Sequence, residues 1–438
     1  MPAPSPFNRS FAAPYYPGYG QFLFDGATVR QWEFNGWKPE SLSWKQTCYI
    51  HAGLSMPGQI LYRGPDAEAF LSEIFINNFS NFRVGTAKHA IACDDEGLIT
   101  AHGVLQRLAP DAFCLFVSGT WTLYRHAITK LNVEQVFLDR FLFQVAGPLA
   151  LKTLEAAAGQ SLADIGFLRC RDINIAGKTV QILRVGMAGS LAYELHGPFA
   201  EGPEIYDAVF RAGQPFGIER LGWRTFQVNH VEGGFPQQFW TFTSSVLEDE
   251  GYRAFARAHP YLPPEPQFIG STDPADRRAR YRTPFEVGWE RSIKLDHDFQ
   301  GRAAVEREMA DPKRTIVTLE WNPEDVVDIH ASLFRPGEEY KYLDAPTSPG
   351  AHPPYAYADD VVKDGRRIGI SSGVVYSYFF RQQLSHCTID RDQAQIGNEV
   401  IVRWGDYGGR IKDVRARVAR FPYLDKDRNQ TVDVQAST

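Results

Sequence analysis

The stretch from Gln181 to Pro198 (QILRVGMAGSLAYELHGP) restricts the fold more than any other part of the chain. Apolar residues alternate at its start, which is the period of a strand. The segment from Gly186 to Ser190 then carries few side chains that would obstruct a ligand, and the apolar pattern resumes at Ala192. Glycine permits a sharp turn and lets a flat ligand approach the backbone. The stretch therefore predicts two strands joined by an open turn.

One acidic residue, Glu194, interrupts the apolar run of the second strand. A carboxylate in such a strand needs a donor, because burying it without one is costly. A structural ion pair with an arginine such as Arg184 or Arg220 would meet this need. A pterin ring would meet it as well, since its 2-amino group and ring N–H lie side by side. The stretch alone leaves both alternatives open.

Length and charge narrow the class of protein. A chain of 438 residues is longer than one compact core usually needs, so we expect two or three domains. Its net charge of −6, with acidic and basic residues mixed, argues against nucleic acid or an anionic membrane as a partner. No apolar run approaches the roughly 18–20 residues of a membrane span, and the N-terminal residues lack the pattern of a secretory signal.

The pattern of the cysteines and the absence of common motifs narrow the class of protein further. The five cysteines are scattered and none forms a C-x-x-C pair, which is typical of reduced core residues in a cytoplasmic protein and predicts no metal site. The chain also lacks a phosphate loop, a G-x-G-x-x-G turn, an H-E-x-x-H helix and a G-x-S-x-G elbow. We therefore expect a cytoplasmic protein whose partner is a small molecule bound by less regular residues.

The secondary-structure pattern is mixed. The segment from Trp44 to Gly64 reads as paired strands, and the amphipathic segment 67–75 reads as a helix with Asp66 as its N-cap. Residues 86–117 predict a three-stranded meander, and 141–145 and 172–185 predict further strands. Residues 248–284 are polar and rich in proline, which predicts a long loop. From Lys313 onward, short strands with glycine turns predict a small all-β barrel.

Seven segments, in order from about Trp44, resemble those of one family. They are YRGPDA with Phe70-Leu71, DEGLI (95–99), AGPLA (146–150) with Leu154, RVGMAG through YE (184–194), 224–234, TPFE (283–286) with FQGR (299–302), and GISSG (369–373) with 400–404. The chain thus resembles the aminomethyltransferases, which comprise the glycine-cleavage T-protein and its folate-dependent relatives. In that family the segment matching 224–234 is a strand.

This resemblance implies an α+β fold, a three-domain cloverleaf around a central folate channel, with a small C-terminal β-barrel. It implies a folate-binding region over residues 1–310, made of two intertwined subdomains with the second at about 55–140, and a barrel domain over 311–438. The cofactor would be tetrahydrofolate. Glu194 would bind the pterin edge, with Tyr193 and Met187 beside it, and His230 would lie near the cofactor tail.

Within the family, the chain most resembles the tetrahydrofolate-dependent O-demethylases of methoxylated aromatic acids such as vanillate and syringate. The segments INIAGKTVQILRVGMAGSLAYELHGP, VTLEWNPEDVVDIHASLF and KLDHDFQGRAA carry this resemblance. It implies transfer of a methyl group from the donor to N5 of tetrahydrofolate, giving a phenol and 5-methyltetrahydrofolate. The methyl donor would be the small-molecule partner.

Three departures from the family leave the catalytic residues to be inferred from chemistry. The acidic pair of the T-protein is replaced by Thr100-Ala101-His102, the demethylase tyrosine is missing from 235–244, and no arginine stands at 117–120. Loss of a methyl from an aryl ether needs an acid or cation at the departing phenolate. The candidates for this work are His102, His51, Tyr16 and Tyr19. Trp240 and Phe242 are candidates for lining the slot of the donor ring.

Two other functions fit the same resemblance. The missing tyrosine leaves room for a non-aromatic donor, such as a sulfonium or methylamine compound, which an aromatic cage would hold. A non-catalytic folate-binding protein that assists iron–sulfur assembly would carry a K-G-C-Y-x-G-Q-E signature, and the chain has no such stretch.

Overall fold

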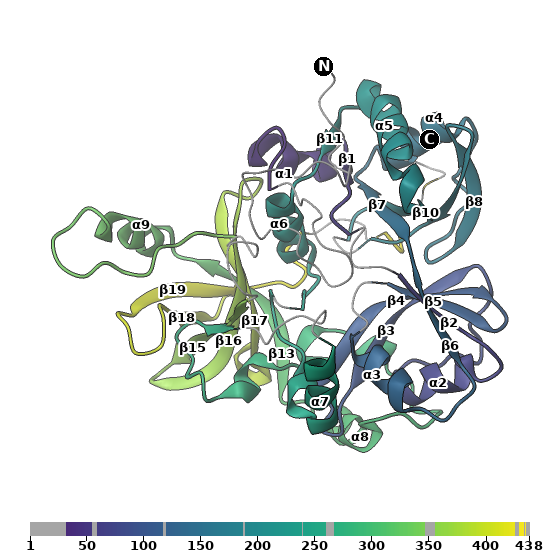
Figure 1. Cartoon of the computed structure of the whole chain (residues 1–438). Helices are drawn as coiled ribbons and strands as arrows, with labels where there is room; N and C mark the ends of the chain where they lie inside the picture. Colours follow the sequence, from purple (N-terminus) through teal and green to yellow (C-terminus); the bar gives the residue numbers. More distant parts are fainter. Residues whose placement is uncertain are drawn as a thin grey trace.

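The computed structural model describes residues 32–54, 59–116, 120–186, 189–238, 240–259, 267–346, 355–424, 429–432 and 434. Figure 1 shows three lobes, built on a six-stranded sheet, a five-stranded sheet and a closed barrel. In the described residues, no helix has the length and apolar character needed to cross a membrane.

The six-stranded sheet holds the stretch that most restricts the fold. Its strand order is β11 (Ile218–Arg220), β1 (Cys48–His51), β7 (Arg140–Ala146), β10 (Ala192–Pro198), β9 (Lys178–Leu183) and β8 (Cys170–Ile175). Two helices, α4 (Ala150–Ala158) and α5 (Gly202–Gly213), share one buried apolar cluster with a face of the sheet. The predicted pair of strands within 181–198 is confirmed, because β9 and β10 pair antiparallel on either side of the glycine-rich break.

The five-stranded sheet has the order β3 (Thr86–Cys93), β4 (Ile99–Ala109), β5 (Ala112–Phe116), β2 (Gln59–Arg63) and β6 (Glu134–Leu138). Helices α2 (Ala67–Ile74) and α3 (Thr120–Ile128) lie on one face and share its core. The predicted meander and helix are confirmed. Asp66 does not cap α2 through its side chain, which instead accepts a hydrogen bond from the backbone N–H of Asn132 at 2.8 Å.

The prediction of paired strands between Trp44 and Gly64 is wrong. Trp44 lies in α1 (Trp37–Gln46), and the two strands that follow belong to different sheets. β1 pairs with β7 and β11, whereas β2 pairs with β5 and β6. Both strands pair with strands that are distant in the sequence, and local alternation cannot identify such partners.

The faces of the two sheets that turn away from their helices meet each other. Ala87, Val104, Cys114 and Phe116 of the five-stranded sheet form one buried cluster with Leu142, Leu183 and Val185 on the other side. The stacked sheets therefore bring β4 and β10 to the same interior, although these strands are far apart in sequence.

The third lobe is a closed barrel, as predicted. Its strands, in order around the barrel, are β13 (Arg314–Trp321), β17 (Gln382–Asp390), β16 (Arg366–Ser377), β15 (Asp359–Lys363), β18 (Glu399–Trp404) and β19 (Lys412–Ala419). Helix α9 (Pro323–Ser332) extends away from the other lobes in Figure 1. The division predicted between residues 310 and 311 falls between α8 (Arg302–Ala310) and β13.

The segment that resembles a family strand, 224–234, is a helix here, α6 (Trp223–Gly233). It lies between α1 and the barrel, and its residues from Thr225 to Gly233 are buried. Because its polar residues are buried together with its apolar ones, the sequence of α6 shows no division into an apolar and a polar face that would reveal a helix. Glu232 of this helix forms a fully buried ion pair with Lys45 of α1 and accepts a hydrogen bond from Ser377 of β16.

The predicted loop over 248–284 also contains regular structure. Helix α7 (Glu250–Ala258) lies within it, and β12 (Gln267–Ile269) pairs in parallel with β14 (Tyr355–Tyr357). Asp249 caps α7, because its carboxylate accepts a hydrogen bond from the backbone N–H of Tyr252 at 2.6 Å.

Candidate functional site

Three polar side chains form one row across the centre of the six-stranded sheet. His51 of β1 lies opposite Gln144 of β7, which lies opposite Glu194 of β10. All three are buried, on the sheet face that turns away from α4 and α5. Because side chains alternate along a strand, Tyr193 lies on the other face, in the core with the two helices. The row is therefore separated from Tyr193 by the sheet itself.

The carboxylate of Glu194 has no hydrogen-bond partner among the described residues, although its side chain is fully buried. Nε2 of His196 lies 3.7 Å from Oε2 of Glu194, which is too long for a hydrogen bond. Burial raises the pKa of Glu194 to about 8, and the nearby Gln144 side chain lowers it in part. With the Gln144 amide beside it and no well-formed hydrogen bond in the described residues, this carboxylate can accept donors from a ligand.

The arginines that were alternatives as partners of Glu194 are engaged elsewhere. Arg184 donates to the side chain and backbone of Asn429, to the carbonyl of Val432 and to that of Ile165. The guanidinium of Arg220 lies over the Phe210 ring, 4.3 Å from its centroid. The structural ion pair is thus not formed, and the ligand alternative remains.

Two buried amides near Tyr49 carry atoms without hydrogen-bond partners in the described residues. Tyr49 donates its hydroxyl hydrogen to Oε1 of Gln144 at 2.5 Å, which leaves Nε2 of Gln144 without a partner in the described part of the chain. Asn229 of α6, also fully buried, lacks partners there for both Oδ1 and Nδ2. An unsatisfied buried polar atom costs about 1–3 kcal/mol, so this concentration of donors and acceptors suits a polar heterocycle that would pair with them.

The turn between β9 and β10 comes very close to its own strand. A Cβ on Gly186 would lie 2.2 Å from the Cβ of Ala192, so only glycine fits at this position. The C-terminal segment fixes the other side of the turn. Asn429 donates its backbone N–H to the carbonyl of Gly189 at 2.6 Å and its amide to the carbonyl of Ala192 at 3.0 Å. Met187, predicted to bind the cofactor, lies outside the described residues.

His102, the first candidate for the acid, lies on the inner face of β4 in an aromatic cluster. Its Nδ1 is 3.3 Å from Nε2 of His89 on β3, and its ring is 4.7 Å from that of Trp289. Phe235 and Phe242 complete the cluster, at 6.1 and 6.0 Å from His102. We call these five residues the His102 cluster. Phe242, predicted to line the donor slot, is therefore brought together with His102.

Burial decides the charge of the two histidines. It lowers the pKa of His89 to about 4 and holds the pKa of His102 well below its ordinary value, with the neighbouring His89 and His230 acting in the same direction. Both rings are therefore neutral near pH 7. A neutral imidazole is a weak proton donor but still offers an N–H to a developing oxyanion. The predicted role of His102 in catalysis stays a prediction, and its lowered pKa favours a neutral hydrogen-bond donor over an acid.

A chain of rings connects the row to the His102 cluster. His51 stacks on Phe226 with 4.2 Å between centroids, and its Nδ1 lies 2.9 Å from the carbonyl of Leu221. His230 is 4.2 Å from Phe226 on the other side and 6.0 Å from Phe235. Burial lowers the pKa of His230 to about 4, so it is neutral as well. His51 and His230 therefore lie between the candidate cofactor half and the candidate donor half.

The remaining predicted site residues lie elsewhere or outside the description. Trp240 packs with Val228, Val231 and the barrel residues Val375 and Leu384, apart from the His102 cluster. Tyr16 and Tyr19 lie outside the described residues, so their predicted roles stay predictions. Within the described part of the chain, no group of His, Cys, Asp or Glu is arranged to hold a metal ion.

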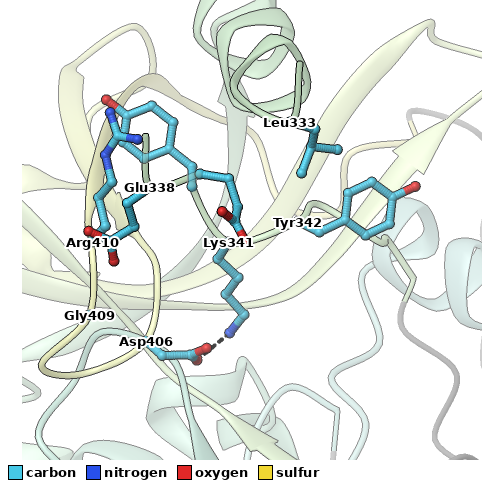
Figure 2. Close-up of a pocket in the computed structure, with 9 residues that line it drawn as sticks. Leu333, Glu338, Lys341, Tyr342, Asp406, Gly409 and Arg410 are labelled. Carbon is cyan, nitrogen blue, oxygen red and sulfur yellow. Dashed lines mark hydrogen bonds and ion pairs between the residues drawn. The ribbon is translucent and has the colours of Figure 1, made fainter. Parts of the chain in front are cut away.

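A separate open pocket lies at the end of the barrel, between the segment after α9 and the turn that joins β18 to β19 (Figure 2). Its two basic side chains interact with neighbours in the pocket. Lys341 pairs with Asp406 at 2.5 Å, and the guanidinium of Arg410 lies 3.9 Å from the centroid of the Tyr340 ring. None of the row or the His102 cluster lines this pocket.

Sequence reasoning missed several residues of the site: Tyr49, His89, Gln144, Asn229 and Trp289. For Gln144 a signal was available, because it interrupts the apolar strand FLFQVA in the way that Glu194 interrupts its own strand. The sequence gives no such signal for Asn229, because this residue lies in a helix whose segment was expected to be a strand. His89 and Trp289 meet His102 only through the fold.

Comparison with known proteins is consistent across sequence and structure. Residues 8–240 match the model of the GCVT N-terminal domain. A sesamin methylene transferase of Sinomonas sp. is 38% identical over 416 residues, covering 92% of each chain. A syringate O-demethylase of Sphingobium sp. is 32% identical over 420 residues, covering 89% of each. The glycine-cleavage aminomethyltransferase T of Bartonella henselae has the same fold, with a TM-score of 0.66 at 16% identity over 94% of this chain and 96% of that one.

Proposed function

We propose that this chain, which belongs to the aminomethyltransferase family, takes a one-carbon group from an aromatic ether and transfers it to tetrahydrofolate. The protein is a one-carbon transferase, and tetrahydrofolate is its cofactor. For the donor we propose first a methoxylated aromatic acid, which would yield a phenol and 5-methyltetrahydrofolate. The similarity to a syringate O-demethylase over 89% of both chains supports this donor class.

The proposed cofactor site rests on one observation: the buried carboxylate of Glu194 has no hydrogen-bond partner among the described residues. We assign it to the pterin edge, where adjacent N–H groups would satisfy both of its oxygens. Gln144 and Asn229 offer further donors and acceptors to the same heterocycle. When bound, tetrahydrofolate supplies the nucleophilic N5 that receives the carbon.

The His102 cluster is the proposed donor half. Its aromatic rings would provide an apolar lining for an aryl ring, and the neutral imidazole N–H of His102 would donate to the ether oxygen. When the carbon–oxygen bond breaks, its electron pair would stay on this oxygen. The oxygen would take up one proton and N5 would lose one, so the number of protons is unchanged. His89 holds the His102 ring through their contact at 3.3 Å.

A specific observation favours a second donor class, a neutral methylenedioxy arene. Apart from burial, the groups that hold down the pKa of His102 are His89 and His230, with no lysine or arginine among them. The relative named for sesamin, at 38% identity, covers 92% of both chains. Such a donor would lose both carbon–oxygen bonds, giving a catechol and 5,10-methylenetetrahydrofolate, with two protons moving from the folate nitrogens to the two oxygens.

One assay separates these functions. The protein is incubated anaerobically with tetrahydrofolate and, in turn, methoxybenzoates, neutral methoxyarenes, methylenedioxyarenes, a sulfonium compound and a methylamine. Chromatography then identifies the folate formed. We expect 5-methyltetrahydrofolate and a phenol from a methoxybenzoate, and 5,10-methylenetetrahydrofolate with a catechol would instead establish the second class. A folate product from the sulfonium or the amine alone, or none from any donor, would refute the proposed aromatic ether transfer.

A further inference from the structure

The orientation of one buried amide, that of Gln59, is fixed from two sides. Gln59 of β2 lies where the two sheets face each other and is 3% exposed. Its Oε1 is 3.2 Å from a guanidinium nitrogen of Arg140, which can only donate a hydrogen bond. Its Nε2 is 3.5 Å from the carbonyl oxygen of Phe141, which can only accept one. The side-chain NH₂ group of Gln59 therefore has to point away from Arg140.

This amide sets the tautomer of His196. The Nε2 of Gln59 lies 3.0 Å from Nδ1 of His196, and an amide NH₂ can only donate. Nδ1 of His196 must then carry a lone pair. Burial, with a contribution from the charge of Arg140, holds the pKa of His196 well below its ordinary value, so the ring is neutral. Its single N–H is consequently on Nε2.

Nε2 is the atom of His196 that faces the proposed pterin carboxylate. It lies 3.7 Å from Oε2 of Glu194, two residues earlier on the same face of β10, and has no other partner in the described structure. Gln181 lies opposite His196 on β9, and its Oε1 accepts a hydrogen bond from Arg140 at 3.3 Å. Two further groups near His196 are the Phe116 ring, 4.9 Å away on β5, and the guanidinium of Arg140 on β7. Neither of these two can accept a conventional hydrogen bond from Nε2.

We propose that Arg140, Gln59 and His196 form a relay that presents a fixed, neutral N–H to Glu194 and so positions its carboxylate for the cofactor. The relay rests on the proposed role of Glu194. A charged histidine at this place would form an ion pair and occupy the carboxylate, and the other tautomer would turn a lone pair toward it. In the free protein the neutral N–H faces Oε2 at 3.7 Å without forming a hydrogen bond. It can close on that oxygen when the ligand binds and still leave further acceptor sites to the ligand, because an ionised carboxylate accepts about four hydrogen bonds.

The tautomer can be measured in the free protein. Nitrogen-15 NMR of the histidine-labelled chain distinguishes a protonated from an unprotonated ring nitrogen, and the signals of His196 are those missing in His196→Gln. We expect Nε2 protonated and Nδ1 unprotonated between pH 6 and 8. A proton on Nδ1, or on both nitrogens, would overturn the relay.

Cofactor binding provides the second arm. His196→Leu removes the donor and is expected to raise the dissociation constant of tetrahydrofolate on the order of tenfold, because hydrogen bonds to charged groups are the stronger ones. His196→Gln keeps an N–H donor and is expected to remain within a few-fold of the original value. The effect on kcat at saturating tetrahydrofolate is expected to be smaller than that on the dissociation constant. The control is His126→Leu in α3, where His126 contacts the carbonyl of Val133 away from the row.

Two outcomes separate the relay from the proposed function. If His196→Leu and His196→Gln weaken binding equally, the N–H of His196 does not position Glu194 and the relay is refuted. If Glu194→Gln leaves tetrahydrofolate binding unchanged, the cofactor assignment fails. The tautomer of His196 in the free protein still decides whether Gln59 sets it.

Discussion

Tetrahydrofolate binding is expected to weaken as the pH falls from 8 to 6, through protonation of Glu194. Burial raises the pKa of this carboxyl to about 8 in the free protein. The ionised form accepts hydrogen bonds from the pterin N–H groups, whereas the protonated form places an O–H against them. Binding therefore selects the ionised form, and the protein must release a proton to bind wherever the pH lies below the pKa.

The size of the effect follows from that pKa. About half of the molecules are ionised at pH 8 and about one in a hundred at pH 6, so the apparent dissociation constant should rise about 50-fold, or about 2.3 kcal/mol. His196 and Tyr49 do not titrate in this interval. Burial holds the pKa of His196 well below it and raises the pKa of Tyr49 above it.

The assay is calorimetric titration with tetrahydrofolate under anaerobic conditions at several pH values, with Glu194→Gln as the matched control. The variant keeps the volume of the side chain but cannot ionise. The other groups that titrate in this range are the same in both proteins. They are Glu40 and Asp359, whose pKa values burial raises to about 7, and the ligand itself. We expect weaker binding in the variant and a much flatter pH profile. A flat profile in the original protein, or the same slope in both proteins, would refute the reasoning.

Three further results are expected. In denaturant unfolding without folate, Glu194→Gln should be more stable than the original protein at pH 8 by up to about 4 kcal/mol and equal to it near pH 4.5, because a raised pKa means that stability is lost as the pH rises through this range. Equal stability at both pH values would contradict this. Lys45→Met should destabilise the fold by about 3–5 kcal/mol in the same measurement, since it leaves the fully buried Glu232 without its cation; a change below about 1 kcal/mol would argue against a desolvated pair. His102→Ala should lower kcat on the order of a hundredfold with the tetrahydrofolate dissociation constant nearly unchanged, and equal losses of both would indicate a structural role.

Much of the fold could be predicted because its signals are local. The alternation around Gly186, the meander with its turns and the short strands after Lys313 each identify elements that the structure contains. The partners of the strands could not be predicted in the same way. β1 and β2 are separated by a few residues yet belong to different sheets, and a segment that is buried on all sides, such as α6, shows no period.

In the candidate site, too, local signals could be predicted from the sequence and long-range contacts could not. Glu194 could be singled out because one acidic residue in an apolar strand has to be explained. Its lack of an internal partner could not be predicted, because that depends on Arg184 binding the C-terminal segment. The relay through Gln59 could not be predicted from the sequence for a related reason. Gln59 and His196 are 137 positions apart and meet only because the two sheets stack.

The transfer of the carbon itself tests the central claim most directly. A single-turnover reaction uses an excess of protein, tetrahydrofolate and a methoxybenzoate labelled with carbon-13 in the methoxy group, and NMR follows the label. The account predicts that the label leaves the ether and enters the N5 methyl group of the folate, in equal amount to the phenol formed, and that Glu194→Gln slows this transfer at limiting cofactor. Label that stays on the arene, or leaves it without entering the folate, would contradict the account.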